Sequence, residues 1–343
     1  MLPVYRSVVT AAAQICPAMG PQDRPGYAGF HPGGVGATAL RKHRIMGFRS
    51  ALMSFYTGKA GEATFRIAMN HHVIGIIGAG NMARSLAGGL VANGWRKQDL
   101  ILSDLDPQQR KAVTETLGLV TYEDNDEVAS RADVIVLAIK PQLLRDVAAG
   151  IAASTQKTRP LVVSIAAGVR VDDLQRWLGG GLAIVRVMPN TAALIGSGAA
   201  GLFANEFATQ SQRDEAESIL RAVGVTVWLE AENLMDVVTA VSGSGPAYFF
   251  LVMEELERAA LKHGLDAATA RLLTLETAYG AAKMALEGGE EPAQLRRRVT
   301  SPGGTTERAV QVLEEGHIGR LFNDAVTAAV ERARELAEIL GKQ

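Results

Sequence analysis

The chain has 343 residues, enough for two domains of ordinary size, and its content of 48% hydrophobic and 21% charged residues is typical of a globular protein. A formal net charge of −1 argues against nucleic acid or an anionic membrane as the main partner. No apolar run reaches the roughly 18 residues that a transmembrane helix requires. The single cysteine, Cys16, excludes an intrachain disulfide and favours the reducing cytoplasm, and the six histidines lack metal-ligand spacing, so no metal site is predicted.

Residues 1–72 differ in composition from the rest of the chain. They carry eight Lys or Arg and only two acidic residues, are rich in Gly and Pro, and show poor periodicity. Three interpretations remain open: a disordered leader with the true start at Met69, an organelle transit peptide, or a basic arm for a partner. We favour the disordered extension, because a dinucleotide-binding strand usually follows its initiator closely. The remaining body then has a net charge of −7.

The stretch from Val73 to Ala83 has the order strand, glycine turn, helix, with the pattern Gly-x-Gly-x-x-Ala. This order is the dinucleotide-binding fingerprint. We expect Gly78 to make the tight turn and Gly80, which has no Cβ, to allow a pyrophosphate close to the backbone. The free N–H groups and the dipole of the following helix then favour phosphate binding.

After this stretch, short apolar runs alternate with helical patterns. The alternation predicts a Rossmann-type α/β domain over residues 73–231, with a doubly wound parallel sheet and right-handed crossovers. Further strands are expected at 99–103, 119–122, 133–138, 161–165, 183–188 and 225–229, and helices at 107–117, 141–153, 171–178 and 211–223.

Residues 232–343 change to helical spacing and predict an all-helical dimerisation domain. Helices are expected behind Pro246 and at 266–287, 291–299, 305–315 and 318–340. These long helices have apolar faces on more than one side, which a half of only about 110 residues cannot cover. We therefore expect a homodimer that interleaves them.

Ligands in such sheets bind beyond the carboxyl ends of the strands. At one strand end, Lys140 is placed to reach toward phosphate or nicotinamide, unless it is simply solvated there. At the end of the following strand, the small residues of 164–168 leave room for a flat ring. At the second strand, Asp104 follows Gly80 by 24 positions and favours NADH, because an acid at about this spacing binds the ribose 2′-hydroxyl. Arg110 and Lys111 follow as weaker partners for the 2′-phosphate of NADPH.

Three later motifs carry polar groups toward the expected crevice. Residues 187–192 read Val-Met-Pro-Asn-Thr-Ala and end a strand, whereas residues 242–248 and 300–306 are glycine-serine turns that each open a helix. The unpaired N–H groups at such helix starts suit a small carboxylate. Ordinary helix capping by Ser and Thr explains either turn on its own.

The order of these motifs resembles that of pyrroline-5-carboxylate reductase over about residues 73–340. The resemblance implies reduction of L-1-pyrroline-5-carboxylate to L-proline by NAD(P)H, the last step of proline biosynthesis. It implies NADPH as the usual cofactor, against the Asp104 argument for NADH as the alternative. It also implies a homodimer, often assembled further into a decamer.

The resemblance assigns roles to individual residues. The substrate loop matches residues 301–306, and Arg298 departs from the family pattern, which leaves its cofactor contact in doubt. Cofactor-binding residues are implied at Ile77, Gly78, Ala79, Gly80, Asn81, Met82, Asp104, Asn125, Ala138, Ile139, Lys140, Pro141, Ile165, Ala166 and Ala167. Substrate-binding residues are implied at Glu232, Gly303, Gly304, Thr305 and Thr306, with Thr306 as the catalytic residue.

In the expected mechanism, backbone N–H groups of residues 303–305 hold the substrate carboxylate and the Thr306 hydroxyl binds the ring nitrogen. No His or Cys lies in these motifs, so solvent is an alternative proton source.

One rival function is a β-hydroxyacid dehydrogenase, which needs a lysine in the helical half; Lys262 and Lys283 occur there, but outside the glycine turns. The other is a non-enzymatic redox sensor, supported only by the basic leader.

Overall fold

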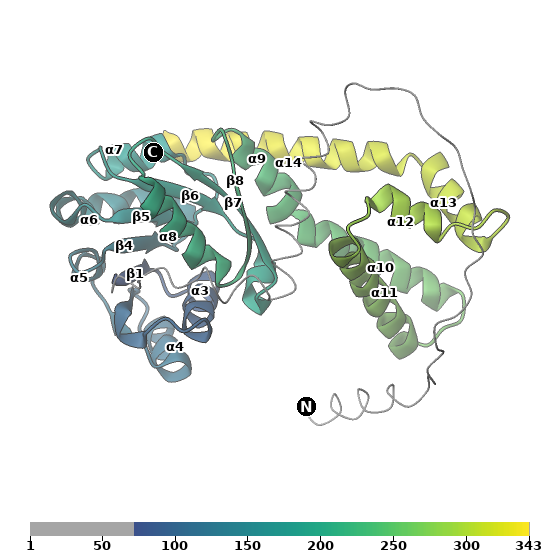
Figure 1. The fold of residues 1–343 in the computed structure, drawn as a ribbon, viewed down its shortest axis with the longest axis horizontal. Helices are drawn as coiled ribbons and strands as arrows, with labels where there is room; N and C mark the ends of the chain where they lie inside the picture. Colours follow the sequence, from purple (N-terminus) through teal and green to yellow (C-terminus); the bar gives the residue numbers. More distant parts are fainter. Residues whose placement is uncertain (1–71, 343) are drawn as a thin grey trace, which may run out of the picture. The chain divides into compact units, whose positions relative to one another are not determined.

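A computed structural model describes residues 72–342, so the expected leader lies outside the described residues except for its last position. An eight-stranded sheet organises the first half, in the order β3-β2-β1-β4-β5-β6-β7-β8 (Figure 1). All neighbouring strands are parallel except β6 and β7, which are antiparallel. The strands are β1 (Ile74–Ile77), β2 (Leu100–Ser103), β3 (Val120–Tyr122), β4 (Val134–Leu137), β5 (Leu161–Ser164), β6 (Ile184–Met188), β7 (Gly198–Ala204) and β8 (Gly224–Trp228).

Successive strand residues point to opposite faces, and each face is covered by its own set of helices. Ile74 and Ile76 of β1 belong to one apolar cluster, which includes side chains of α3 (Asn81–Ala92), α4 (Pro107–Leu117) and α8 (Gln210–Arg221). Ile77 belongs to a second cluster, on the face covered by α5 (Asn125–Ala129), α6 (Leu144–Thr158) and α7 (Val171–Trp177). Burial on both faces explains the near-continuous apolar runs of the central strands.

The Rossmann-type fold is confirmed, and the differences from the expected elements are local. Strand β7 was missed because Gly198–Ala204 is rich in Gly and Ala, which have low strand propensity. The helix expected at 141–153 begins as the short 3₁₀ turn η3 (Pro141–Leu143) and continues as α6. Helix α5 was also missed, since five residues are too few to show a period.

The second half contains only helices among the described residues. They are α9 (Leu234–Val238), the π-helical turn η5 (Thr239–Gly243), α10 (Gly245–Lys262), α11 (Ala267–Glu287), α12 (Pro292–Arg298), α13 (Thr305–Glu315) and α14 (Ile318–Gly341). Helix α10 packs on α11, and α14 packs on α9, η5 and α13. The predicted boundary between residues 231 and 232 falls in the segment between β8 and α9, and the boundary itself stays a prediction.

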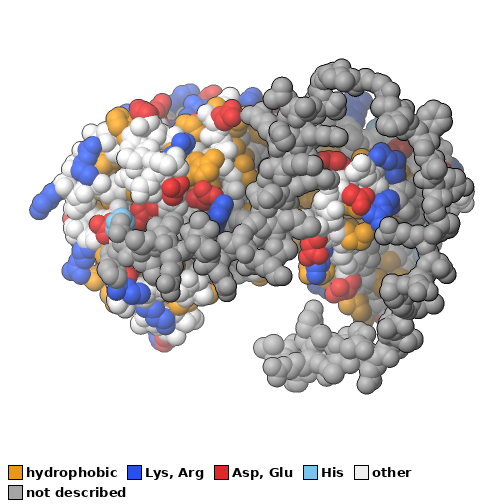
Figure 2. All heavy atoms as spheres, viewed as in Figure 1, with side chains coloured by type: hydrophobic (Ala, Val, Ile, Leu, Met, Phe, Trp, Pro, Cys, Tyr) orange, Lys and Arg blue, Asp and Glu red, His pale blue; other side chains and the backbone are white. Residues whose placement is uncertain are grey.

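Few side chains in this helical half are buried within the chain. Large apolar residues such as Phe249 on α10 (69% exposed) and Leu321 on α14 (65% exposed) face outward. Figure 2 shows hydrophobic side chains on the surface of this half among Lys, Arg, Asp and Glu. A helical half with so little internal core needs a second protein surface to cover it.

Residues 242–248 open a helix as predicted, because α10 begins at Gly245 with Ser244 as its N-cap, but the helix start is not free. Helices α9 and α10 are joined by η5 into one continuous run, and the Ser244 N–H donates to the Thr239 carbonyl oxygen. Pro246 has no N–H for the carbonyl of Ser242, four residues earlier, so the helix accommodates it with a π turn. The Ser242 carbonyl oxygen instead accepts a hydrogen bond from Nδ2 of Asn190, at 3.2 Å.

Candidate functional site

The glycine turn after β1 has the geometry of a phosphate cradle. Gly78 has φ +100°, and a Cβ there would lie 2.5 Å from the Ala138 carbonyl oxygen, so only glycine fits. Gly80 precedes α3 as its N-cap, and a Cβ placed on it would meet no atom within 4 Å. No side chain caps the start of α3. This open, uncapped helix start therefore fits the pyrophosphate of a dinucleotide.

A cavity of about 190 Å³ lies beside this turn, at the carboxyl ends of β1, β4, β5 and β6. Its lining is apolar and consists of Met82, Ala138, Ile139, Ile165, Ala167, Met188 and Pro189. Five of these seven are residues that the sequence assigned to cofactor binding. Small and apolar walls of this kind suit a flat ring such as nicotinamide.

The other predicted cofactor residues lie around this cavity or the turn. Ile77 and Ala79 are buried, and Asn81 is exposed at the first position of α3. Ala166 is buried behind the cavity, whereas Lys140 is exposed at the start of η3 and Pro141 follows it. None of these residues lines the cavity itself.

Asp104 lies directly after β2 and is bound to the glycine turn. Its carboxylate accepts a hydrogen bond from the Ala79 N–H at 2.7 Å and another from the Asp106 N–H at 2.9 Å. The guanidinium of Arg110 donates to the Asp104 carbonyl oxygen at 2.7 Å. The Asp104 carboxylate, predicted to select the cofactor, is therefore held in place by two backbone N–H groups, and the Arg110 guanidinium lies next to this residue.

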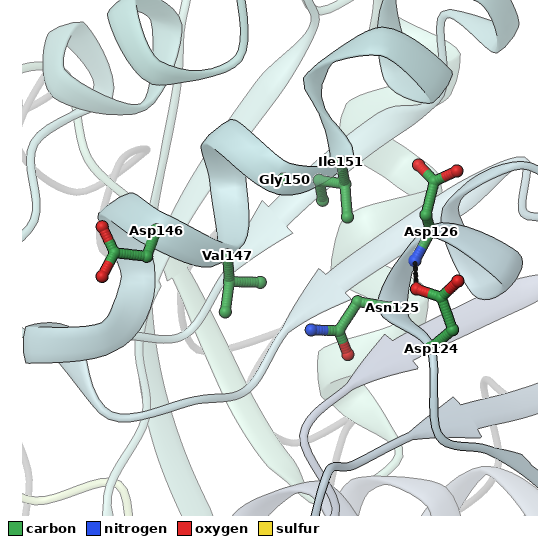
Figure 3. A pocket seen from close by; sticks show the side chains of 7 residues that line it. All are labelled: Asp124, Asn125, Asp126, Asp146, Val147, Gly150 and Ile151. Atoms are coloured by element: carbon green, nitrogen blue, oxygen red, sulfur yellow. Dashed lines mark hydrogen bonds between the residues drawn. The ribbon is translucent and has the colours of Figure 1, made fainter.

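Asn125 lies at the start of α5 and accepts a hydrogen bond from the Ser103 hydroxyl at 2.8 Å. It also lines a second cavity of about 240 Å³ between α5 and α6, together with Asp124, Asp126, Asp146, Val147, Gly150 and Ile151. Figure 3 shows the Asp146 carboxylate pointing away from those of Asp124 and Asp126. The three acids do not converge, and no group of three metal-ligating side chains occurs among residues 72–342.

The predicted substrate loop precedes α13 and is largely exposed. The Gly303 N–H donates to the Glu307 carboxylate at 2.7 Å, and the Gly304 N–H donates to the Ser301 carbonyl oxygen at 3.0 Å. Thr305 and Thr306 form the first turn of α13. Neither of the two cavities includes a residue from this loop.

Glu232 lies between β8 and α9 and is bound to the sheet domain. Its Oε1 accepts a hydrogen bond from Nη1 of Arg186 at 2.9 Å and one from the Val171 N–H at 2.8 Å. Arg186 is on β6 and only 3% exposed. Glu232 thus neutralises a buried charge, a role that the sequence did not indicate.

The sequence did not predict three residues in and around the site. Met188 and Pro189 line the first cavity, although the sequence singled out their motif only for its polar groups. Arg186 is the third; a charged residue inside an otherwise apolar strand was the available signal, since such a residue requires a buried partner.

Comparison with known proteins identifies relatives for both halves. Residues 232–336 match the family model described as pyrroline-5-carboxylate reductase dimerisation, and residues 73–168 match the model described as NADP oxidoreductase coenzyme F420-dependent. The chain is 47% identical over 269 residues to pyrroline-5-carboxylate reductase of Pseudomonas aeruginosa, covering 78% of this chain and 98% of that protein.

Two solved structures are similar over the same length. The structure of a pyrroline-5-carboxylate reductase from Coxiella burnetii has a TM-score of 0.76 and 46% identity, and covers 78% of this chain and 99% of that chain. The structure of Plasmodium falciparum pyrroline carboxylate reductase with NADP bound has a TM-score of 0.69 and 30% identity, and covers 78% of this chain and 98% of that chain.

One helical run of the second half is unusually apolar. By length and composition alone, Leu234–Lys262 is long and apolar enough to cross a membrane, with a mean hydropathy of 1.2 in an 18-residue window. Charged residues such as Glu254 and Arg258 interrupt the run, so the sequence did not predict it. The run lies inside the residues that match the dimerisation model, and a partner subunit would cover the same apolar surface.

The relatives match this chain over nearly their whole length, and the glycine turn and the apolar cavity fit a nicotinamide dinucleotide. The chain therefore belongs to the pyrroline-5-carboxylate reductase family, the NAD(P)H-dependent oxidoreductases that convert L-1-pyrroline-5-carboxylate to L-proline.

Proposed function

We propose that this reductase binds its dinucleotide along the carboxyl ends of β1, β2, β4 and β5, and that it prefers NADPH to NADH. The apolar cavity beside Gly80 is the observation that carries the proposal, because five residues implied for cofactor binding line it together. The NADP-bound relative at 30% identity supports the choice of NADPH. The Asp104 carboxylate argues for NADH, but it already accepts hydrogen bonds from two backbone N–H groups. The neighbouring Arg110 guanidinium donates to the Asp104 carbonyl oxygen and pairs with Glu123.

We further propose that the loop of residues 301–306 holds the substrate carboxylate. The hydrogen bond from the Gly303 N–H to the Glu307 carboxylate supports this assignment, because it shows that one of the predicted donors can bind a carboxylate. A substrate carboxylate would replace that of Glu307 at the same N–H. Thr305, Thr306 and Glu232 complete the proposed substrate residues.

The loop and the apolar cavity belong to one active site only if a second subunit contributes. Within one chain, neither of the two cavities described above is lined by both the loop and the strand ends. We propose a homodimer, in which the exposed apolar helices of two copies interleave and the active site lies between subunits. The decamer that the resemblance implies would be a further assembly of such dimers, and the single Cys16 supports a cytoplasmic protein.

In the proposed mechanism, the chain's main task is positioning. When bound, the cofactor would supply the hydride for the imine carbon, and solvent would supply the proton for the ring nitrogen. The N–H groups of the substrate loop orient the ring through its carboxylate, and the Thr306 hydroxyl binds the ring nitrogen. The apolar walls around Met82 and Ile165 keep water away from the reacting face.

The test is a steady-state assay that follows absorbance at 340 nm, with NADPH and NADH in parallel and pyrroline carboxylate, a hydroxyacid or a keto acid as substrate. We expect turnover with pyrroline carboxylate alone and a higher kcat/KM with NADPH. The variant Thr306→Ala should lower kcat with cofactor affinity nearly unchanged, and Thr306→Ser, which keeps the hydroxyl, should restore it. An unchanged kcat in Thr306→Ala would remove this residue from the mechanism.

Assembly is tested separately by sedimentation of the purified full chain at micromolar concentration. A dimer or a multiple of dimers is expected, because the apolar faces of α10, α11 and α14 are exposed in one chain. A monomer with full activity would contradict the proposed shared site.

A further inference from the structure

The loop between β5 and α7 forms one wall of the apolar cavity and is supported from behind by the end of the chain. Its residues Ile165 and Ala167 line the cavity. At Gly168, in the same loop, a Cβ would lie only 3.1 Å from Cδ1 of Leu340. The last turn of α14 therefore packs directly against the back of the loop.

Leu340 belongs to the core beneath the cofactor turn. It is 6% exposed and lies in the same apolar cluster as Ile77 at the end of β1, and as Ala166 and Val169 of the loop. Figure 1 shows the C-terminal end of α14 beside α7. A residue from the end of the helical half thus completes the packing under the cavity wall.

Two polar contacts fix the position of this last turn. Nη2 of Arg176 on α7 donates to the Gly341 carbonyl oxygen at 2.9 Å and to the Asp173 carboxylate at 2.6 Å. Asp173 itself is 7% exposed and packs against Gly341, where a Cβ would come within 2.8 Å of its Oδ2. The turn is therefore held in one register on α7, and Leu340 with it.

We propose that the last turn of α14, residues 337–341, is a positioning element for the nicotinamide half of the cofactor site, with Leu340 as its central residue. Residues 337–341 follow the end of the family-model match at residue 336. The inference rests on the proposed cofactor site. Leu340 acts through the loop and not by contact with the cofactor. Removing its buried side chain would leave space into which the loop relaxes.

The test compares Leu340→Ala with Ile339→Ala in the full-length protein. Ile339 is the adjacent residue on the same helix and is 51% exposed, so its truncation controls for the helix and for assembly. Three quantities are measured: KM for NADPH, KM for pyrroline carboxylate, and the dissociation constant of adenosine 2′,5′-bisphosphate, which carries only the adenine half. Sedimentation verifies that both variants assemble like the unchanged protein.

We expect Leu340→Ala to raise KM for NADPH about fivefold, with adenosine bisphosphate affinity unchanged and with recovery in Leu340→Met. Ile339→Ala should leave all three quantities as they are. The proposal is overturned if the two alanine variants behave alike, or if Leu340→Ala weakens NADPH and the adenine fragment equally, since the effect is then on the whole fold. If the unchanged protein fails to oxidise NADPH with pyrroline carboxylate, the proposed function fails instead.

Discussion

Arg186 and Glu232 form an ion pair, with 2.9 Å between Nη1 and Oε1, that joins a central strand of the sheet to the start of the helical half. The guanidinium is almost fully buried, whereas the Glu232 side chain is 22% exposed. Removing one partner of such a pair leaves an uncompensated buried charge. We predict that Glu232→Gln lowers the free energy of unfolding by about 3 kcal/mol, measured by denaturant titration.

The double variant Arg186→Met/Glu232→Gln separates stability from substrate binding. It removes both charges, so most of the lost stability should return. If Glu232 also contacts the substrate, as proposed, the double variant keeps a raised KM for pyrroline carboxylate despite its recovered stability. A double variant as unstable as Glu232→Gln would show that the loss does not come from the unpaired guanidinium.

Asn190 provides a second link between the two halves. Its Nδ2 donates to the Ser242 carbonyl oxygen, and its Oδ1 accepts from the Ala199 N–H at 3.1 Å. We predict that Asn190→Ala costs about 1–3 kcal/mol in thermal or denaturant unfolding, because it leaves both backbone groups without this partner.

The matched test is a double-mutant cycle with Pro246→Ala. Alanine at position 246 restores an N–H that can bond to the Ser242 carbonyl oxygen within the helix. The cost of Asn190→Ala should therefore be smaller in the Pro246→Ala background. Equal costs in both backgrounds would mean that the Ser242 carbonyl contributes nothing to the effect.

The elements predicted correctly from the sequence are those whose cause is local. The turn at Gly78 follows from a backbone conformation that other residues avoid, and the buried strands follow from apolar runs. Strand β7 and the π turn before Pro246 were not predicted, because their local signals are weak and distant partners complete both elements. The Gly198–Ala204 segment becomes a strand by pairing with β6 and β8, and the π turn is completed by Asn190.

The same distinction applies to the site. Ile139 and Ile165, which the resemblance assigns to the cofactor, lie beside the apolar cavity, because residues next to the strand ends are placed by the sheet. The ion pair of Arg186 with Glu232 could not be predicted, since its members are 46 residues apart and nothing local connects them. The relation of the substrate loop to the cavity is also beyond prediction from one chain, because it depends on a second subunit in the proposed homodimer.

Cofactor preference should respond to Asp104. Replacing its carboxylate in Asp104→Ser removes a negative charge at the end of β2, where the ribose is expected. We predict that the ratio of kcat/KM for NADPH to that for NADH rises about tenfold, which corresponds to about 1.4 kcal/mol. Both constants should also fall, because the Ala79 N–H loses its acceptor.

Asp104→Asn is the control for that loss. It keeps an oxygen that can accept from the Ala79 N–H while it removes the charge, so the ratio should still rise with a smaller fall in both constants. A ratio that stays unchanged in both variants would place the ribose away from Asp104.

The two glycines of the turn allow the cofactor contact to be separated from the fold. Gly78→Ala forces a Cβ to within 2.5 Å of the Ala138 carbonyl oxygen at a φ of +100°, so we predict a large loss of stability together with loss of cofactor binding.

Gly80→Ala places its Cβ in open space, so the thermal midpoint should stay within a few degrees of the original. Its dissociation constant for NADPH should nevertheless rise at least about tenfold, because the methyl group enters the space expected for the pyrophosphate. Calorimetric titration with NADPH and a thermal scan of each variant measure both effects. Tight NADPH binding by a stable Gly80→Ala protein would mean that the pyrophosphate does not approach this helix start.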